Sequence, residues 1–401
     1  MALAWLTPAA LLKRLLGTSY PISHNENLTE INAVSSVDSL ATVIFSSGST
    51  GDPKGVMLTH FNIASNIRQI SQVFMLGGSD KILGILPFFH SFGFMAALWL
   101  PAANGVGVVY HSNPLDAQVI GELVKKYKVT FMVATPTLLQ AYMRRYSPES
   151  FGSLQYVLVG AEKLPERLAQ AFEDTFGIRA LEGYGCTECS PVVTVNGRDF
   201  RAPGFRQVAA KRGKIGHPLP GVTVKVVDIE SGKPVAAGIS EMLLVKGPNV
   251  MKGYLGRPDK TAEVLNNGWY TTGDVAMVDE DGFVTITDRL SRFSKIGGEM
   301  VPHIRIEEKL HDLAGSIEQV FAVTSLPDEK KGERIAVITT LSEAKLIPVL
   351  EKLLQCDLPV LWKPKSNLFF HADSLPMLGT GKTDLRGVRL LASSLAQEAE
   401  V

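Results

Sequence analysis

A stretch without Lys, Arg, Asp or Glu extends from Ile82 to Leu115, and it constrains the fold of this 401-residue chain more than any other feature. Because a bilayer span needs only about 20 apolar residues, a transmembrane helix is the first alternative to weigh. Glycines, prolines and polar residues divide the stretch into KILGIL, SFGFMAALWL and VGVVY, which are typical of a strand, a helix and a strand. The sequence therefore predicts a buried parallel βαβ unit instead of a membrane span.

The rest of the chain predicts an α/β fold in a large domain, followed by a small α+β domain. The runs ATVIFS, VTFMVA and QYVLV are strand-like and alternate with helical patterns, such as the one after Thr59 that places Ile63, Ile67 and Ile70 on one face. We expect strands such as ATVIFS and KILGIL to be buried on both faces of a parallel sheet. We expect a linker or docking segment at 1–36, a large domain at 37–288 that includes a β-rich subdomain at 214–288, and a mobile small domain at 289–401. A hinge is expected near 288–291.

Composition narrows the classes of partner and the compartment. Forty Lys and Arg balance forty Asp and Glu, so we expect no nucleic-acid partner. Three cysteines are too few for a disulfide framework and favour a reducing, cytoplasmic location. Lys13 and Arg14 follow the apolar N-terminal residues, which inverts the charge order of a signal peptide. With no transmembrane segment expected, only peripheral association with the inner face of the membrane is left open.

The segment SSGSTGDPKG, residues 46–55, is the most informative motif for function. Its glycines, hydroxyl side chains and Lys54 can surround a polyphosphate with backbone N–H groups, hydroxyls and one ammonium group. The spacing of a Walker A loop is absent here. It is absent again at GTGKTD near the C-terminus, where Pro376 occupies the position of the first Walker glycine, so a P-loop phosphotransferase is disfavoured.

Together with five further motifs, this loop resembles the adenylate-forming superfamily. The motifs occur in the family's order: LPFFHSFGF (86–94), GAE (160–162), EGYGCTE (182–188), YTTGD (270–274) with DR (288–289), and GTGKTD (379–384). VMLTHFNIASNI and SKIGGEM are most similar to the acyl-ACP synthetase module of bifunctional 2-acylglycerophosphoethanolamine acyltransferases. Family members carry a further subdomain ahead of the phosphate loop, so the resemblance also implies an N-terminally truncated chain.

The resemblance implies a fold and a two-step reaction. The fold is a large adenylate-forming domain followed by a small α+β domain. In the reaction a fatty acid, with a long chain favoured, is activated with ATP and Mg²⁺ to an acyl-adenylate, and is then transferred to the thiol of acyl carrier protein or coenzyme A. The chain is accordingly expected to be an AMP-forming acid–thiol ligase. The alternative is an impaired nucleotide- or acyl-binding fragment that needs a partner chain.

By the same resemblance, Lys382 is the catalytic cation that bridges the carboxylate and the α-phosphate. Thr187 would contact the α-phosphate, Glu188 would hold Mg²⁺, and His90 would lie where the acyl group enters. The residues implied to hold the β and γ phosphates are Ser46, Ser47, Gly48, Ser49, Thr50, Gly51 and Lys54. Those implied to form the adenine slot are Gly160, Ala161, Glu162, Glu182, Gly183, Tyr184 and Gly185. Asp274 and Arg289 are implied at the ribose, and Lys295 is implied at the loop that meets the thiol substrate.

Several of these residues have structural interpretations that the sequence leaves open. His90, flanked by phenylalanines, is nearly as well explained as a packed core histidine. Cys186 and Cys189 form a C-x-x-C that no second pair completes, so we interpret it as coincidence. His111 and Asp116 match the H-x-x-x-x-D spacing of glycerolipid acyltransferases. The partner motifs of that family are missing, so we expect Asp116 to be a helix N-cap.

Overall fold

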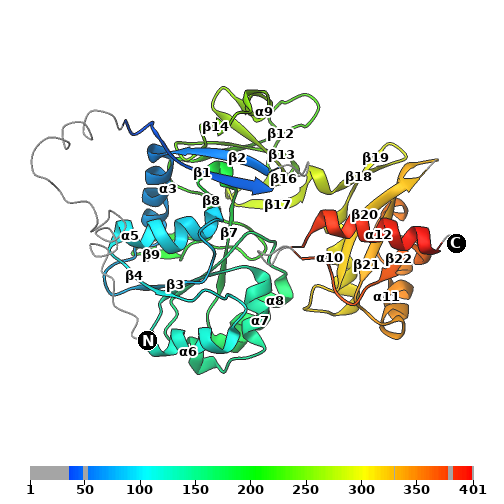
Figure 1. Cartoon of the computed structure of the whole chain (residues 1–401), viewed down its shortest axis with the longest axis horizontal. Helices are drawn as coiled ribbons and strands as arrows, with labels where there is room; N and C mark the ends of the chain where they lie inside the picture. Colours follow the sequence, from blue (N-terminus) through cyan, green and yellow to red (C-terminus); the bar gives the residue numbers. More distant parts are fainter. Residues whose placement is uncertain (1–35, 48–52, 329, 378–382, 400–401) are drawn as a thin grey trace, which may run out of the picture.

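The computed structural model describes residues 36–47, 53–328, 330–377 and 383–399. They form a larger part, which ends with strand β17 (Val284–Arg289), and a smaller C-terminal part that lies beside it (Figure 1). None of the helices within these ranges is long and apolar enough to cross a membrane. Most of the expected N-terminal segment, residues 1–35, lies outside the described residues.

A seven-stranded sheet forms the centre of the larger part, in the order β11-β8-β7-β6-β5-β3-β4. The five strands from β7 to β4 in this order run parallel, whereas β8 and β11 are antiparallel to their neighbours. The strands are β3 (Lys81–Gly84), β4 (Gly107–Tyr110), β5 (Phe131–Ala134), β6 (Tyr156–Val159), β7 (Ala180–Gly185), β8 (Val192–Val195) and β11 (His217–Pro218).

The βαβ unit predicted from the uncharged stretch is confirmed. Its strands β3 and β4 are parallel neighbours. They are joined through α4 (Ser91–Gly93), the π-helix η1 (Phe94–Trp99) and α5 (Leu100–Asn104). The expectation of full burial holds only for β3, because β4 is the edge strand and its side chains are half-buried or exposed.

Helices cover both faces of this sheet, and alternate strand residues point into the two layers. Ile82 and Phe131 pack on the side of α3 (His60–Val73), η1 and α5. Leu83 and Met132 pack on the other side, where the helices are α6 (Ala117–Tyr127), α7 (Pro136–Met143) and α8 (Glu166–Phe176). This alternation is why the strands consist of nearly continuous apolar residues.

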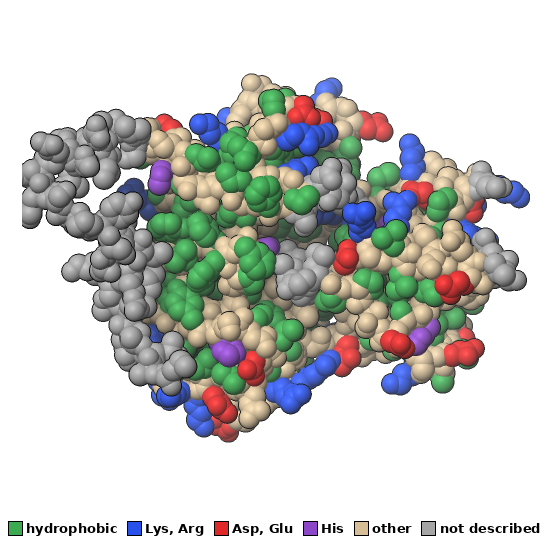
Figure 2. Space-filling view, in the orientation of Figure 1, with side chains coloured by type: hydrophobic (Ala, Val, Ile, Leu, Met, Phe, Trp, Pro, Cys, Tyr) green, Lys and Arg blue, Asp and Glu red, His purple; other side chains and the backbone are tan. Residues whose placement is uncertain are grey.

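The expectation that ATVIFS forms a strand is confirmed, but its expected burial on both faces of a parallel sheet is wrong. It is β1 (Leu40–Ser47), which pairs antiparallel with β2 (Pro53–Thr59) in a separate sheet completed by β14 (Gly253–Tyr254). Only residues 48–52 separate β1 from β2, whereas parallel neighbours need a crossover of about a dozen residues or more. Phe45 is therefore 65% exposed. Figure 2 shows hydrophobic side chains gathered over this face.

The rest of the larger part is β-rich, as the short strands and turns predict. The strands β12 (Thr223–Val227), β13 (Glu241–Lys246), β15 (Leu265–Asn266), β16 (Trp269–Val278) and β17 form one antiparallel sheet, next to helix α9 (Pro258–Val264). A separate hairpin, β9 (Phe200–Ala202) and β10 (Phe205–Gln207), precedes this sheet in the chain. The 3₁₀ helices are η2 (Pro148–Phe151), η3 (Thr187–Cys189), η4 (Leu290–Arg292), η5 (Val360–Trp362) and η6 (Ser366–Leu368).

The C-terminal part is a sheet between helices, as expected from its α+β pattern. The sheet order is β19-β18-β21-β20, with β22 parallel to β21. Helices α10 and α11 cover one face and α12 covers the other. The elements are β18 (Phe293–Ile296), β19 (Glu299–Pro302), α10 (His303–Ala314), β20 (Phe321–Asp328), β21 (Gly332–Thr339), α11 (Glu343–Gln355), β22 (Phe369–His371) and α12 (Leu385–Ala399).

Ion pairs hold the C-terminal part against the end of α7, the segment before α8, and α8. The larger part contributes cations and the C-terminal part contributes acids, all on exposed side chains or nearly so. The pairs are Arg144 with Glu318, Lys163 with Glu308, and Arg167 with Asp312. Exposed pairs contribute little each, about 0–1 kcal/mol, so this contact can be exchanged for another arrangement at low cost.

Candidate active site

Most of the motifs predicted to carry function meet at the carboxyl ends of the parallel strands. The segment after β3 supplies His90 and Ser91, the segment after β6 supplies Gly160, and β7 runs directly into η3. In an open α/β sheet this edge is where ligands bind, because successive loops diverge there. The strand order therefore brings together residues that are up to about a hundred positions apart.

Gly185 and Thr187 form the turn at the end of β7. A Cβ atom on Gly185 would lie 2.2 Å from the carbonyl oxygen of Pro191, so only glycine fits. The hydroxyl of Thr187 lies 3.1 Å from that of Ser91, on the loop after β3. These two hydroxyls thus face each other across the strand ends, where a phosphate or carboxylate oxygen can accept from both.

Glu188 is 9% exposed and is held from two directions. The hydroxyl of Tyr254 donates to its Oε1 at 2.9 Å, and the hydroxyl of Ser46, at the end of β1, donates at 3.5 Å. Lys54 Nζ lies 5.1 Å from the centre of the Tyr254 ring. Ser46 therefore lies next to the carboxylate to which the resemblance assigns Mg²⁺, and Lys54 lies next to its partner Tyr254.

The donors around Glu188 suit a magnesium ion that is shared with a nucleotide. Mg²⁺ in proteins is commonly bound by one or two carboxylates plus phosphate oxygens and water. Within the described ranges, no group of three or more His, Cys, Asp or Glu could hold a metal without such help. The residues present therefore fit Mg²⁺ bound with ATP.

Asp274 joins the end of β7 to the β-rich sheet. Its carboxylate accepts a short hydrogen bond from the hydroxyl of Tyr184, and its Oδ1 lies 3.3 Å from Nε of Arg289. Strand pairing between β16 and β17 places Asp274 directly opposite Arg289. Burial raises the pKa of Asp274, while Arg289 and Tyr184 act in the opposite direction. The expected neighbourhood of Tyr184, Asp274 and Arg289 is thus present.

The GAE segment bends sharply next to this group. Ala161 has a φ of +73°, which only a few per cent of non-glycine residues adopt. A Cβ on Gly160 would lie 3.2 Å from the carbonyl oxygen of Gly183 and 3.5 Å from the Phe92 ring. The missing side chain therefore lets β7 and Phe92 approach the GAE segment closely.

Two predicted site residues make contacts that the sequence does not indicate. The Glu182 carboxylate accepts a hydrogen bond from the backbone N–H of Gly213 at 3.1 Å, and burial raises its pKa to about 7. The Glu162 carboxylate accepts from the hydroxyl of Thr137 at 2.9 Å. Both carboxylates therefore brace loops around the predicted nucleotide slot.

His90 lies at the beginning of α4, where it acts as a helix cap. Its Nδ1 accepts from the backbone N–H of Phe92 at 3.3 Å, and the side chain is half-buried. Phe92 lines a narrow apolar cavity that extends between the sheet and the helices α3 and η1. Apart from Phe92, the residues that line this cavity are Ile70, Phe74, Met95, Ala96, Leu100, Phe131, Leu158 and Val192.

Other predicted residues lie away from this group or beyond the described ranges. Lys295 is exposed on the β18–β19 hairpin, where its backbone N–H donates to Glu333. The side chain of Ser47 is not described. Outside the described residues lie Gly48, Ser49, Thr50, Gly51 and Lys382.

Sequence reasoning missed Tyr254, Ser91 and Thr137. Ser91 stands inside the LPFFHSFGF motif, directly after His90, so its position was a usable signal. Nothing in the sequence around Tyr254 indicates a site. It reaches Glu188 only because β14 pairs with β2.

The two competing motifs also have defined geometry. Nε2 of His111 lies 3.3 Å from Oδ2 of Asp116, without the alignment of a hydrogen bond. Asp116 is the N-cap residue of α6, as expected, although its side chain makes no capping hydrogen bond. A hydrogen bond with Cys189, and then burial, raise the pKa of Cys186, which disfavours the reactive thiolate form.

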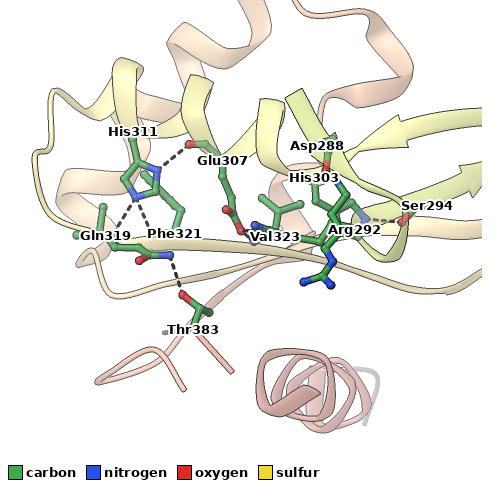
Figure 3. A network of polar contacts seen from close by, with 12 residues as sticks. Asp288, Arg292, Ser294, His303, Glu307, His311, Gln319, Phe321, Val323 and Thr383 are labelled. Atoms are coloured by element: carbon green, nitrogen blue, oxygen red, sulfur yellow. Dashed lines mark hydrogen bonds and ion pairs between the residues drawn. The ribbon is translucent and has the colours of Figure 1, made fainter. Parts of the chain in front are cut away.

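A network of polar contacts connects the two parts of the chain at the position where a hinge is expected (Figure 3). Asp288 is 1% exposed, and its Oδ1 accepts the backbone N–H of Arg289 at 2.7 Å. Its Oδ2 makes no well-formed hydrogen bond to any described residue. After Asp288 in the chain, Arg292 forms an ion pair with Glu307 of α10. The hydroxyl oxygen of Ser294 lies 2.6 Å from Nε2 of His303.

Fold and site geometry agree with the expected family, and comparison with known proteins identifies it. Residues 10–255 match the family of AMP-binding enzymes. The chain belongs to the AMP-binding enzyme family. It is 34% identical over 350 residues to a feruloyl-CoA synthase of an Amycolatopsis species, a match that covers 86% of this chain and 68% of the relative. It is 32% identical over 324 residues to a long-chain-fatty-acid–CoA ligase of Bacillus subtilis, a match that covers 79% of this chain and 56% of the relative.

Solved structures show the same fold. ATP-bound MatB from Rhodopseudomonas palustris superposes with a TM-score of 0.78 at 28% identity, over 90% of this chain and 69% of that one. The o-succinylbenzoate CoA synthetase of Bacillus subtilis, bound to its acyl-adenylate intermediate, superposes with a TM-score of 0.75 at 26% identity. This match covers 88% of this chain and 70% of that one. The same synthetase has been solved with ATP and a magnesium ion. Enzymes of this family use ATP with Mg²⁺ to form acyl-adenylates, and acyl-CoA ligases are among them.

Proposed function

We propose that this chain activates a long-chain fatty acid with ATP and Mg²⁺ and transfers the acyl group to a thiol. The apolar layer behind Phe92 supports the proposal. Phe92 packs beside Gly160, and the cavity that Phe92 lines is surrounded by side chains without charge. The cavity has a volume of only about 10 Å³, so in our proposal its lining moves apart to admit the hydrocarbon chain, while the carboxylate stays near the Ser91–Thr187 hydroxyl pair.

The site residues have distinct tasks in the first step. A carboxylate must approach a phosphate, so oriented donors and cations have to be in place before the reaction. In our proposal Thr187 and Ser91 donate hydrogen bonds to oxygen atoms at the reacting centre. Mg²⁺ supplies charge neutralisation when bound, and Glu188, fixed by Tyr254, would hold it. Lys54 approaches the phosphates, and Lys382 supplies the bridging cation.

The nucleoside would be held by the group around Asp274. Ionised Asp274 can accept from the ribose hydroxyls, and Arg289 compensates its buried charge. The ring of Tyr184, fixed by its hydrogen bond to Asp274, would stack on the adenine between β7 and the GAE segment. The carboxylates of Glu182 and Glu162 act indirectly, by holding the walls of this slot.

The cavity can be tested with one matched pair of substitutions. Ala96→Phe adds a ring to a residue that lines the cavity, whereas Ala103→Phe adds the same ring on the exposed side of α5. ATP–pyrophosphate exchange, and the amount of acyl-AMP formed as detected by mass spectrometry, would be measured with saturated fatty acids of increasing chain length. We expect Ala96→Phe to lose long acids while keeping short ones, and Ala103→Phe to behave as the original chain. An equal effect on all acids would contradict the placement of the acyl chain.

The acceptor thiol is a separate part of the proposal. The motifs resemble a module that serves acyl carrier protein, whereas the relatives compared above are CoA synthases and ligases. Supplying purified acyl-AMP with either thiol and comparing rates of thioester formation decides between them. ATP binding without acyl-AMP formation would instead favour the alternative of a binding fragment. We place the protein in the cytoplasm, associated peripherally with the inner face of the membrane.

A further inference from the structure

The hairpin β9–β10 exposes aromatic side chains instead of burying them. Phe200 is 57% exposed and Phe205 is 56% exposed, with ring centres 6.1 Å apart. Every residue from 198 to 208 is exposed. A two-stranded hairpin is at best marginally stable alone, so this exposed apolar face needs a binding role to explain it.

The register makes the hairpin amphipathic. Ala202 stands opposite Phe205, and Arg201 stands opposite Arg206. Since side chains alternate between the faces of a strand, both phenylalanines and Ala202 share one face while both arginines share the other. Residues 198–208 contain three arginines and one aspartate, a net charge of +2. An apolar face backed by long cationic side chains is the arrangement of an interfacial element.

The position of the hairpin connects it to the acyl cavity. Arg198, at its base, lies over the Tyr156 ring with its Cζ 4.0 Å from the ring centre. Tyr156 packs edge-to-face on Phe74 at 5.3 Å, and Phe74 lines the cavity. The base of the hairpin is thus connected through Tyr156 to Phe74, which lines the cavity. Strand β9 also lies on the side of the larger part away from the C-terminal part (Figure 1).

We propose that the β9–β10 hairpin docks the protein on an anionic lipid surface. Phe200 and Phe205 enter the boundary between headgroups and acyl chains, while Arg201 extends to lipid phosphates. Arg206 lies 3.5 Å from Asp199, and exchanges this exposed partner for a lipid phosphate. Two phenylalanines and Val208 form too small a patch for a specific protein interface, which buries about 800 Å² per partner. Aromatic and cationic side chains together are typical of the membrane–water interface. The function of this contact, access of a lipid-dissolved acid to the cavity, rests on the proposed activity.

Co-sedimentation of the full chain with vesicles tests the docking without ATP or substrate. The vesicles are equal parts phosphatidylglycerol and phosphatidylcholine, or phosphatidylcholine alone, at low and at physiological salt. We expect binding to the anionic vesicles that weakens with salt. Arg201→Gln with Arg206→Gln should reduce the affinity about thirtyfold, since each arginine near an anionic surface contributes about fivefold. Phe200→Ser with Phe205→Ser should reduce it about tenfold or more.

The matched control is Leu354→Ser with Val360→Ser, which removes two side chains that are 77% and 87% exposed in the C-terminal part. This control should bind vesicles as the original chain does, and circular dichroism should show all variants folded. Failure to bind anionic vesicles, equal binding to neutral ones, or full binding by the hairpin variants would overturn the proposal. Saturable binding of the hairpin to an acidic protein without vesicle binding would also overturn it. Because no step uses ATP, these outcomes are distinct from failure of the proposed activity.

Discussion

Replacing Asp288 by asparagine should stabilise the protein at neutral and alkaline pH. Burial is the main influence on this carboxyl group and raises its pKa from 3.8 to about 7, against smaller opposite effects of the Arg289 backbone N–H and of Arg292. The backbone of Ile304 also lowers the pKa, and Glu307 raises it. The ionised side chain is thus more costly in the folded protein than in the unfolded chain. Asparagine keeps the shape and the acceptor for Arg289 without the charge.

The raised pKa of Asp288 sets the magnitude and the sign of the expected change in the free energy of unfolding. Each pKa unit corresponds to about 1.36 kcal/mol, so a rise from 3.8 to about 7 destabilises the folded protein by at most about 4 kcal/mol once the group is ionised. Below pH 3.8 both states are protonated and the cost is absent. It grows as the pH rises to about 7 and is constant above. Because the raised pKa already includes the attraction to Arg292, this value is the upper limit of the gain, and we expect Asp288→Asn to gain about 2–4 kcal/mol at pH 8.

Urea unfolding at pH 5, 6, 7 and 8 measures this difference. His303, whose pKa burial lowers to about 3, makes stability rise with pH over part of the same range, so the original chain alone is not informative. The difference between Asp288→Asn and the original chain isolates Asp288, and it should increase with pH up to about 7. Asp373→Asn, on an exposed side chain, is the control and should change nothing. A difference that is independent of pH would refute the reasoning.

Three further substitutions test the candidate site. Asp274→Asn should weaken ATP binding about tenfold or more in calorimetry, because a charge-assisted hydrogen bond contributes about 1.5–3 kcal/mol; unchanged affinity would remove Asp274 from the ribose. Lys382→Ala should slow acyl-AMP formation by about 10²–10³ or more while thioester formation from supplied acyl-AMP persists, and equal loss in both half-reactions would contradict its role in the first step alone. Gly185→Ala should abolish nucleotide binding or folding, because its Cβ would lie 2.2 Å from the Pro191 carbonyl oxygen, whereas Gly78→Ala meets no atom within 4 Å and should be neutral in binding and thermal unfolding.

The sequence by itself determined the local elements, and it predicted the chemistry of single motifs. Runs such as VTFMVA and QYVLV are apolar on both faces, which is possible only for strands covered by helices on both sides, and the structure has them as β5 and β6. The spacing of Ile63 and Ile70 places both on the buried face of α3. Glycine-rich and hydroxyl-rich segments could be assigned to phosphate binding because their backbone requirements are local.

Tertiary structure decided which of these segments meet, and with what charge. ATVIFS has the composition of a central strand, yet it lies in a separate antiparallel sheet, because only a few residues separate it from β2. Tyr254 contacts Glu188 only through the pairing of β14 with β2, and Asp288 acquires its raised pKa only when α10 packs against β17. Burial, long-range strand pairing and desolvation depend on distances between residues that are far apart in the chain. Local patterns do not contain those distances, because they arise only when the sheets and helices pack.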